Sequence, residues 1–315
     1  MKIAFCADPL DGFKTYKDST YAMMVEAARR GHAVFAFEQK DMAIDYGQVV
    51  ANVRHITITD DSGSQPTWYR AADPASTQLR DVDAVIMRKD PPFDMEYIYA
   101  TYLLELAENH GARVFNKPAA VRSHNEKLAI TQFPQFIAPT LVTSDAARIR
   151  VFHAEHRDII LKPLDGMGGT GIFRVREDEL NLGAIVETLT NNGRWTIMVQ
   201  RFIPEIVDGD KRVLLIGGTV VPFCLARIPQ GKEVRGNLAA GGVGVAKPIS
   251  EHDRAIASTL APQLAARGLL LVGLDVIGNY MTEINVTSPT CFQEIKQQTG
   301  FDVASLFIDA VEKAI

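Results

Sequence analysis

The segment DIILKPLDGMGGTGIFRV, residues 158–175, decides between two folds. Its centre, GMGGTG, matches G-x-G-x-x-G, the fingerprint of a dinucleotide-binding turn, and Glu187 follows at about the spacing of the ribose-binding acid. That turn needs a helix after its glycines, because the helix N-terminus binds the pyrophosphate. Residues 172–175, IFRV, predict a strand instead. The segment therefore predicts a glycine-rich flap between two strands, whose backbone N–H groups can bind phosphates.

An ordinary hairpin loop explains the same glycines, since tight turns also need residues that tolerate positive φ. A Walker A loop is excluded, because its G-x-x-x-x-G-K-[ST] pattern is absent. Without a helix dipole, the positive charge at a phosphate flap must come from side chains. Lys162 lies on the incoming strand and Lys127 lies at the start of the same structural unit. These two lysines could supply that charge, and the hairpin loop remains the alternative.

The composition predicts a cytoplasmic globular protein of two or three domains, with 315 residues, 47% hydrophobic residues and 23% charged residues. A net charge of −5 gives no electrostatic reason to expect nucleic acid or a membrane as partner. The N-terminus does not resemble a secretion signal, and no window approaches the apolar length of a membrane helix. Three widely spaced cysteines match neither a disulfide framework nor a zinc site.

The order of predicted elements indicates an α/β protein with α+β parts. Strands and helices alternate through residues 1–122, which predicts a doubly wound parallel sheet, but the first strand-to-helix loop has only one glycine and no dinucleotide turn. Residues 123–200 form a second unit that contains the flap, and its first segment, 123–133, predicts a helix. Residues 201–315 form a third unit, where Gly217 and Gly218 predict a hairpin.

A second cluster of polar residues lies near the C-terminus. Asp275 interrupts the apolar strand LLLVGLDVIG, and Glu283 and Asn285 are two residues apart on the next strand, so they share one face. A turn between the strands brings these oxygen ligands together, in a set suited to Mg²⁺ bound jointly with phosphates. The alternatives are a solvated strand face or a buried carboxylate paired with an arginine.

Three arginines lie at predicted strand ends: Arg88, Arg212 and Arg227. Each one alone is typical of a surface ion pair. Guanidinium groups also bind carboxylates and phosphates with two hydrogen bonds, so three of them near the predicted metal site favour a pocket for an anionic substrate.

Seven ungapped blocks together resemble the bacterial glutathione synthetases of the ATP-grasp superfamily. They are MRKDPPFD, NKPAAVRSHNEKL, LKPLDGMGG, DGDKRVL, CLARIPQG, RGNLAAGG and TEINVTSPT. The resemblance implies an N-terminal domain followed by a two-lobed ATP-grasp fold. It also implies ligation of γ-glutamylcysteine to glycine through an acyl phosphate, with ATP as co-substrate and two Mg²⁺ ions that Mn²⁺ can replace, in a homotetramer. The alternative is another ATP-grasp carboxylate–amine ligase.

The resemblance also implies a role for each matching residue. Arg88, Arg212 and Arg227 are the expected catalytic residues, with Arg212 at the acyl phosphate. Residues 228–243 are the expected mobile lid over the substrate. The ATP phosphates are assigned to Lys127, Lys162 and the flap 165–171 with Gly166, Gly168 and Gly169, adenine to Gln200, Arg201, Phe202 and Ile203, and the ribose to Asp210. The metals are assigned to Asp275, Glu283, as the bridge, and Asn285, and the peptide substrate to Arg88, Arg227, Asn285, Ser288, Thr290 and Glu294.

Overall fold

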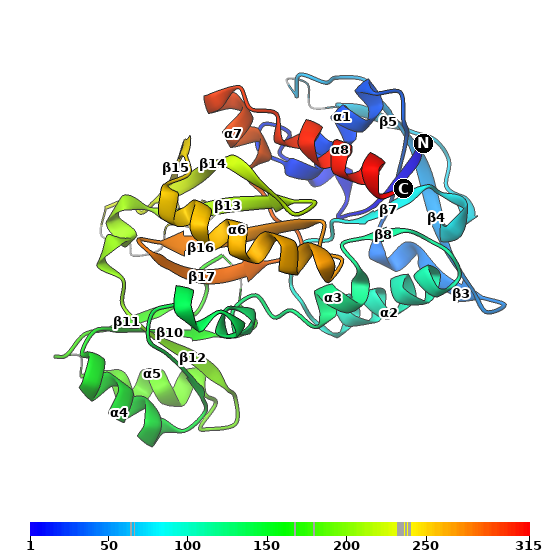
Figure 1. The fold of residues 1–315 in the computed structure, drawn as a ribbon. Helices are drawn as coiled ribbons and strands as arrows, with labels where there is room; N and C mark the ends of the chain where they lie inside the picture. The colour runs from blue at the N-terminus through cyan, green and yellow to red at the C-terminus, as the bar shows by residue number, and fades with distance from the viewer. Residues whose placement is uncertain are drawn as a thin grey trace.

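The computed structural model describes residues 1–315 apart from 64, 66, 167, 179, 232–235, 237, 239 and 240. Parts of the expected lid, 228–243, and one flap residue, 167, therefore lie outside the described residues. The described chain forms three sheets with helices packed on their faces (Figure 1). None of its described helices combines the length and the apolar character needed to cross a bilayer.

The N-terminal sheet has the predicted parallel centre, made of β1 (Lys2–Cys6), β2 (Ala33–Phe37), β7 (Ala84–Met87) and β8 (Val114–Phe115). Antiparallel strands extend it beyond β2, in the overall order β3-β4-β2-β1-β7-β8. These added strands are β3 (Met42–Asp45), β4 (Gln48–Ile58), β5 (Tyr69–Ala71) and β6 (Ala75–Gln78).

Three helices cover this sheet. The side chain of Asp18 accepts a hydrogen bond from Tyr21 N at 2.8 Å and so caps the first of them. This cap fixes the end of the loop that follows β1. The helices are α1 (Ser19–Arg29), α2 (Met95–Asn109) and α3 (Pro118–Arg122), and the short 3-10 turns of this part are η1 (Leu10–Gly12), η2 (Gln39–Asp41) and η3 (Leu79–Asp81).

The second sheet carries the flap and confirms its expected surroundings. Strand β10 (Ile159–Pro163) enters the flap and β11 (Phe173–Val175) leaves it, and the two strands pair antiparallel. The segment is strand–loop–strand, so the dinucleotide turn is excluded. We call this second sheet the lid sheet; it is distinct from the expected lid, 228–243. Its strand order is β11-β10-β12-β9, with β9 (Thr140–Thr143) and β12 (Ile197–Arg201), and the helices of this unit are α4 (Ala146–His156) and α5 (Leu182–Leu189).

The third sheet is antiparallel, in the order β15-β14-β13-β16-β17. Its predicted hairpin is confirmed, because Gly217 and Gly218 connect β13 to β14 with φ of 55° and 79°, a region that favours glycine. Its elements are β13 (Asp210–Ile216), β14 (Thr219–Ile228), β15 (Val243–Pro248), β16 (Leu271–Ile277), β17 (Tyr280–Asn285), α6 (Glu251–Ala266), α7 (Phe292–Thr299), α8 (Val303–Ala314) and the 3-10 turn η6 (Pro204–Asp208).

The helix predicted over 123–133 is wrong. This segment forms only the 3-10 turn η4 (Leu128–Gln132), and a second 3-10 turn, η5 (Pro134–Phe136), follows it. The side-chain oxygen of Asn125 accepts hydrogen bonds from Lys127 N and Leu128 N at 3.1 and 2.9 Å, and a proline follows soon after. Such local side-chain bonds compete with an α-helix. The result places Lys127 at a fixed point beside β17, since Ile284 N donates to Glu126 O at 2.8 Å.

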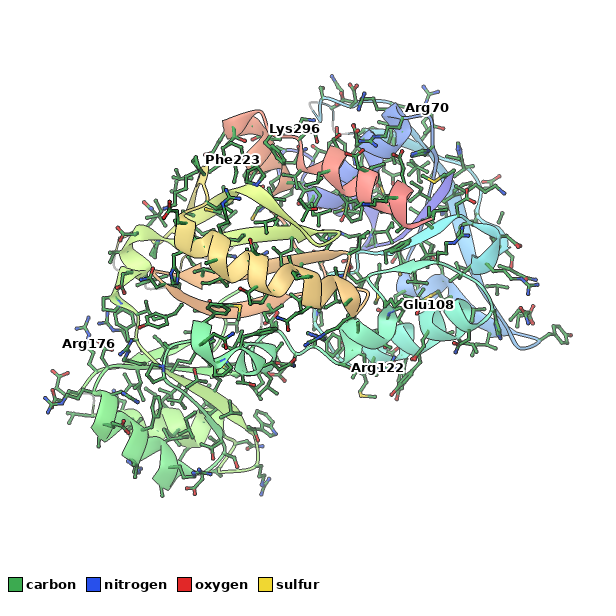
Figure 2. All side chains as sticks on the ribbon, viewed as in Figure 1. Arg70, Glu108, Arg122, Arg176, Phe223 and Lys296 are labelled. Atoms are coloured by element: carbon green, nitrogen blue, oxygen red, sulfur yellow. The ribbon has the colours of Figure 1, made fainter. Side chains whose placement is uncertain are left out.

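Alternation along β13 explains how this strand serves both the core and a polar site. Val213 and Leu215 belong to the core cluster that includes α6, whereas Leu214 and Ile216 belong to the cluster that includes α8. Side chains fill the space between these layers (Figure 2). Arg212 shares the face of Leu214 but lies nearer the start of the strand, beyond the apolar packing, where the face opens into a pocket.

Candidate functional site

A pocket of about 540 Å³ is lined by the lid sheet, the third sheet and the loops of the N-terminal domain. It gathers nearly all of the residues that the sequence singled out; Arg88 and Asp275 are the exceptions. The predicted residues that line it are Lys127, Lys162, Gly166, Gly168, Gly169, Gln200, Arg201, Phe202, Ile203, Asp210, Arg212, Arg227, Glu283, Asn285, Ser288, Thr290 and Glu294.

Three charged residues form a row across the floor of the pocket. Arg212 on β13 lies opposite Asp275 on β16, and Asp275 lies opposite Glu283 on β17. Residues opposite one another in antiparallel strands point to the same face. The middle position belongs to Asp275, which is 2% exposed and lies beneath the pocket rather than in its lining.

Asp275 is held by two arginines. Its carboxylate oxygens lie 2.5 Å from Arg212 Nε and 2.9 Å from Arg227 Nη2. Burial alone would raise the pKa of Asp275, but Arg212 and Arg227 outweigh burial and lower it. In this structure Asp275 therefore has the environment of a buried carboxylate paired with arginine, which was the structural alternative to a metal ligand.

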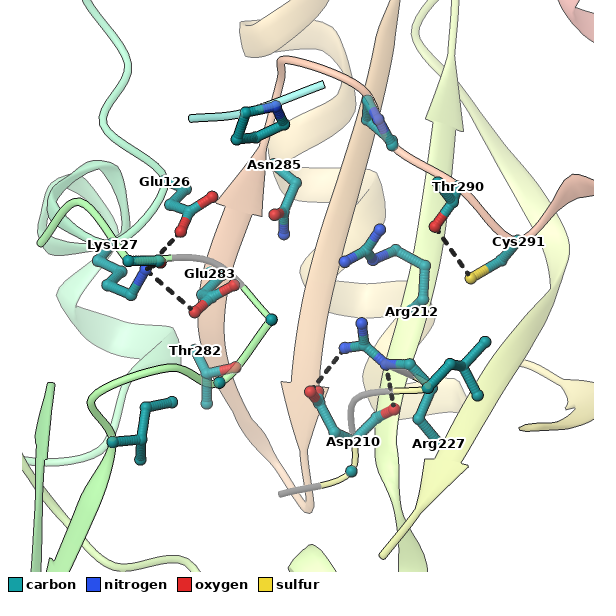
Figure 3. Close-up of a pocket in the computed structure, with 18 of the residues that line it drawn as sticks. Glu126, Lys127, Asp210, Arg212, Arg227, Thr282, Glu283, Asn285, Thr290 and Cys291 are labelled. Atoms are coloured by element: carbon teal, nitrogen blue, oxygen red, sulfur yellow. Dashed lines mark hydrogen bonds and ion pairs between the residues drawn. The ribbon is translucent and has the colours of Figure 1, made fainter. Parts of the chain in front are cut away.

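Asp210 and Arg227 form a second pair, one step further along the sheet (Figure 3). Arg227 Nη2 donates to Asp210 Oδ2 at 2.6 Å, and Arg227 Nε donates to the backbone oxygen of Asp210 at 3.2 Å. Burial raises the pKa of Asp210 to about 7, although the charge of Arg227 acts to lower it. Arg227 also contacts Asp275, so the two carboxylates share this arginine. Arg212 and Arg227 both line the pocket, so their guanidinium groups are accessible to an anionic ligand.

Lys127 connects the flap to the carboxylates of Glu126 and Glu283 (Figure 3). Its Nζ donates to Gly166 O at 2.6 Å, contacts Glu126, and lies 3.6 Å from Glu283 Oε1. Burial disfavours the ammonium charge, but Glu283 and Glu126 outweigh burial and raise the pKa of Lys127. The charged amine therefore lies between the flap backbone and β17.

Lys162 approaches the same place from the lid sheet. It is buried, and its Nζ donates to Thr282 O at the long distance of 3.3 Å. Burial lowers the pKa of this amine even though Glu283 favours the charged form. An additional anion beside Nζ would offset the burial penalty, so the environment favours an anionic ligand here.

Glu283 and Asn285 offer oxygen ligands of the type that Mg²⁺ prefers. Asn285 Nδ2 donates to Gly273 O at 3.3 Å, which leaves the amide oxygen available. Burial and the charge of Glu283 raise the pKa of Glu126, so a cation beside these two carboxylates would relieve their repulsion. Within the described part of the chain no group of three or more His, Cys, Asp or Glu side chains could hold a metal alone. The residues fit a metal whose remaining ligands come from phosphates and water.

Arg88 lies behind the pocket wall. It lines a small separate cavity of about 10 Å³ together with Thr287, a residue that also lines the main pocket. Arg88 Nε donates to Thr20 Oγ1 at 3.0 Å, while its buried Nη1 has no hydrogen-bond partner among the described residues. The guanidinium thus retains an unused donor close to the loop that carries Ser288 and Thr290.

The end of the pocket that includes Glu294 contains residues that sequence reasoning missed. Lys14, Lys17 and Asp18 come from the loop after β1. Their position at the carboxyl end of a parallel strand, where ligands bind in α/β sheets, is the sequence signal that could have identified them. Asp90 and Glu126 also line the pocket, and the signal available for them was their place in the blocks MRKDPPFD and NKPAAVRSHNEKL. Cys291 lines the pocket but lies outside the quoted blocks. Glu294 also lines the pocket, and its buried Oε2 has no hydrogen-bond partner among the described residues.

The opposite end of the pocket is apolar. Ile160 on β10, Phe202, Ile203 and Ile277 on β16 line it. Gln200 joins them, with its Nε2 donating to Thr140 Oγ1 at 2.9 Å. This end can hold a flat hydrophobic group, while the lysines and the flap lie nearer the charged end.

The comparisons with known proteins agree with this arrangement. The family model described as "Prokaryotic glutathione synthetase, N-terminal domain" matches residues 1–122, and "Prokaryotic glutathione synthetase, ATP-grasp domain" matches residues 126–300. Among curated proteins, the chain is 62% identical to "Glutathione synthetase" of Ralstonia nicotianae over 314 residues, which covers 100% of this chain and 96% of the relative. The chain is 48% identical to "Glutathione synthetase" of Vibrio parahaemolyticus, with 100% and 99% coverage.

Among solved structures, the D-cycloserine synthetase DcsG is similar with a TM-score of 0.67 at 16% identity, over 100% of both chains. The ATP-grasp ligase PsnB, solved with a minimal precursor, Mg and ADP, has a TM-score of 0.63 at 17% identity, over 99% of this chain and 97% of that one. At this identity the likeness supports the ATP-grasp fold alone.

Proposed function

The chain belongs to the prokaryotic glutathione synthetase family of ATP-dependent ligases, and on that premise we propose how its pocket joins γ-glutamylcysteine to glycine. A carboxylate oxygen of γ-glutamylcysteine attacks the γ-phosphorus of ATP, and ADP leaves. The amine of glycine then attacks the acyl carbon, and phosphate leaves. The observation that carries the proposal is the convergence of two lysines, a glycine flap, oxygen ligands and two arginines in one pocket.

The first demand on such a site is the neutralisation of approaching negative charges. We assign the ATP phosphates to Lys127 and Lys162, which reach the same point from different parts of the fold. The backbone of the flap covers the phosphates from the lid side. Gly168 and Gly169 adopt φ of 64° and 82°, which lets the chain turn closely there without a side chain.

We propose that Glu283 and Asn285 would hold the divalent metal, two Mg²⁺ ions that Mn²⁺ can replace. Asp275 is proposed as a third ligand, a role for which its carboxylate would have to release one of the two arginines that it binds here. When bound, the metal supplies Lewis-acid charge to the phosphate oxygens. Within this chain, Asp275 also orients Arg212 and Arg227 toward the pocket.

The nucleoside fits the apolar end. We assign adenine to the segment Gln200–Ile203, with Phe202 as a wall, and the ribose to Asp210, whose buried Oδ1 has no hydrogen-bond partner among the described residues. A ribose hydroxyl can donate to that oxygen.

The peptide substrate occupies the charged end. We propose that Arg212 stabilises the acyl phosphate and that Arg227 binds a substrate carboxylate with its planar guanidinium. The unused donor of Arg88 is proposed to bind the substrate beside Thr287, and the unused acceptor of Glu294 to take an N–H of the γ-glutamyl group. Asn285, Ser288 and Thr290 complete the contacts, and the segment 228–243 is proposed to close over them and exclude water.

The decisive experiment measures ADP release with each substrate omitted in turn. Release that requires ATP, γ-glutamylcysteine and glycine together supports the proposal. Turnover with a different acceptor, and none with this pair, would assign the pocket to another ATP-grasp carboxylate–amine ligase. The proposed cytoplasmic homotetramer rests on family resemblance, and light scattering on the purified protein tests its mass.

A further inference from the structure

The apolar wall of the pocket is supported from outside by a charged side chain. The guanidinium carbon of Arg174 lies 3.5 Å from the centroid of the Phe202 ring. Phe202 lines the pocket, whereas Arg174 does not. A planar cation at this distance covers one side of the ring and attracts it electrostatically. The ring thus has the guanidinium against one face and also lines the pocket that would hold a base.

Arg174 is itself fixed by Asp158. Arg174 Nε donates to Asp158 Oδ1 at 2.9 Å and Arg174 Nη2 donates to Asp158 Oδ2 at 2.6 Å, a bidentate arrangement that sets the plane of the guanidinium. Phe202 N in turn donates to the backbone oxygen of Asp158 at 2.9 Å. Asp158 therefore holds both partners of the stack, one through its side chain and the other through its backbone.

The position of Arg174 in the chain connects this stack to the flap. Arg174 lies on β11, three residues after Gly171, where the chain leaves the flap, and it pairs with Ile160 of the pocket wall. Movement of the flap strand would shift the guanidinium against the ring. Neither Arg174 nor Asp158 was identified by any sequence motif.

We propose that Arg174, held by Asp158, is a positioning residue for the nucleobase, which acts by fixing the orientation of the Phe202 ring. The inference rests on the proposed function, because it requires adenine at the apolar end of the pocket. Its expected signature is selective: binding of the base weakens without Arg174, while contacts with the phosphates and with the peptide substrate remain.

The test compares Arg174→Met with Arg176→Met, a matched control at an exposed arginine just after β11 (Figure 2). Arg174→Met should raise the KM for ATP and the Kd for ADP by about 10-fold, with kcat within about two-fold of wild type. Arg176→Met should change neither. Arg174→Lys, which keeps the charge but loses the planar stack, should resemble Arg174→Met. If the wild-type enzyme ligates the two substrates and Arg174→Met has an unchanged KM for ATP, the role of Arg174 is overturned and the proposed function stands.

Two further measurements separate positioning of the Phe202 ring from general damage to the lid sheet. Inhibition by tripolyphosphate, which has no base, should be equal in wild type and Arg174→Met; a weakened inhibition would show that the arginine acts on the phosphate site and would overturn the proposal. In a Phe202→Leu background, Arg174→Met should add no further increase in KM for ATP, because the two residues act through one contact. Full additivity of the two substitutions would contradict the mechanism. If the wild-type enzyme does not ligate γ-glutamylcysteine and glycine, the proposed function itself is contradicted.

Discussion

Arg212 on β13 and Asp275 on β16 face each other directly, with Arg212 Nε 2.5 Å from Asp275 Oδ1 in the buried floor of the pocket. Arg227 reaches the other oxygen of the same carboxylate at 2.9 Å. One acid therefore organises both of the arginines that we assign to the reacting anions. The two charges that we propose for catalysis are thus held by a residue outside the pocket lining.

Replacing Asp275 with Asn should destabilise the protein strongly. The substitution leaves two buried guanidinium groups without their shared countercharge, and removal of one partner from a buried ion pair costs about 3–5 kcal/mol. Urea unfolding measures the change, and Asp208→Asn, at an exposed position just before β13, is the control. A free energy of unfolding within about 1 kcal/mol of wild type would show that Asp275 does not hold the arginines.

Replacing Gly273 with Ala should impair catalysis through Arg212. A Cβ at residue 273 would lie 2.8 Å from Arg212 Cδ and 3.2 Å from Pro289 Cβ, so the arginine has to move. We expect kcat to fall at least about 10-fold with little change in the KM for ATP, because a small misplacement of a charge-stabilising group is costly. Gly183→Ala, where the new methyl group meets only Arg150 at 3.5 Å, should leave kcat unchanged. Equal kcat values in the two variants would contradict the steric argument.

The flap and the third sheet were predictable because their signals are local. The strand that follows Gly171 and the Gly217–Gly218 hairpin each depend on residues next to one another in the chain. The same holds for the shared face of Glu283 and Asn285. The failed helix at 123–133 shows the limit of periodicity, because one side chain, Asn125, redirects the backbone by binding two amides.

The partners of Asp275 were not predictable in the same way. Which arginine meets a carboxylate depends on the register between β13 and β16, strands separated by 54 residues in the chain. From the sequence, Asp275 could be either a metal ligand or the partner of an arginine. Only the register of β13 against β16 shows that it meets Arg212. The role of Lys14 and Lys17 at the pocket also follows from the packing of distant loops.

Replacing Glu283 with Gln should nearly abolish turnover. The carboxylate lies 3.6 Å from Lys127 Nζ and is proposed to hold the metals, so the substitution would remove a negatively charged ligand from them. We expect a fall in kcat of at least about 100-fold and a higher Mg²⁺ concentration at half-maximal rate. Glu187→Gln, at an exposed position on α5, is the control. Wild-type rates and an unchanged Mg²⁺ dependence would exclude Glu283 as a ligand.

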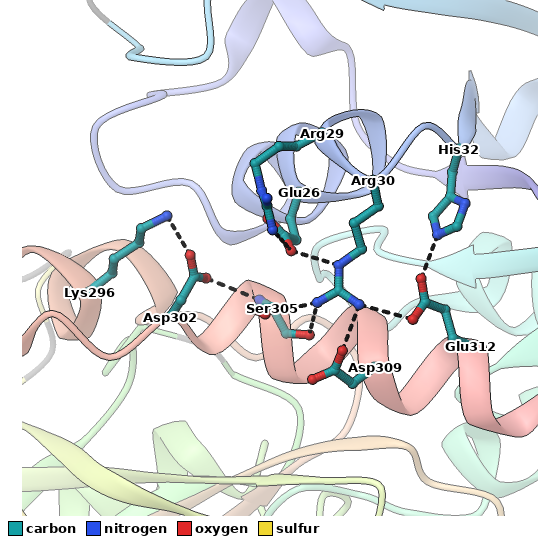
Figure 4. Close-up of polar contacts among 9 residues, drawn as sticks. All are labelled: Glu26, Arg29, Arg30, His32, Lys296, Asp302, Ser305, Asp309 and Glu312. Carbon is teal, nitrogen blue, oxygen red and sulfur yellow. Dashed lines mark hydrogen bonds and ion pairs between the residues drawn. The ribbon is translucent and has the colours of Figure 1, made fainter.

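A cluster far from the pocket should control stability in acid. Arg30 at the end of α1 joins that helix to α8 (Figure 4): its Nη1 lies 2.6 Å from Asp309 Oδ1 and 2.9 Å from Glu312 Oε2. Its Nε lies 2.7 Å from Glu26, which also binds Arg29. The hydrogen bonds from these arginines lower the pKa of Glu26 to about 2 against the effect of burial.

Because the folded state lowers the pKa of Glu26, this carboxylate stabilises the fold above its ordinary pKa of about 4.3, and the stabilisation is lost as the pH falls from there toward 2. Glu26→Gln cannot titrate, so it should be less stable than wild type at pH 7, and the difference should shrink as the pH falls from 5 to 3. Urea unfolding at several pH values in this range measures it. Glu96→Gln, at an exposed position on α2, should follow the wild-type profile. A gap between wild type and Glu26→Gln that stays constant from pH 7 to 3 would mean that Glu26 is not the group that titrates with folding.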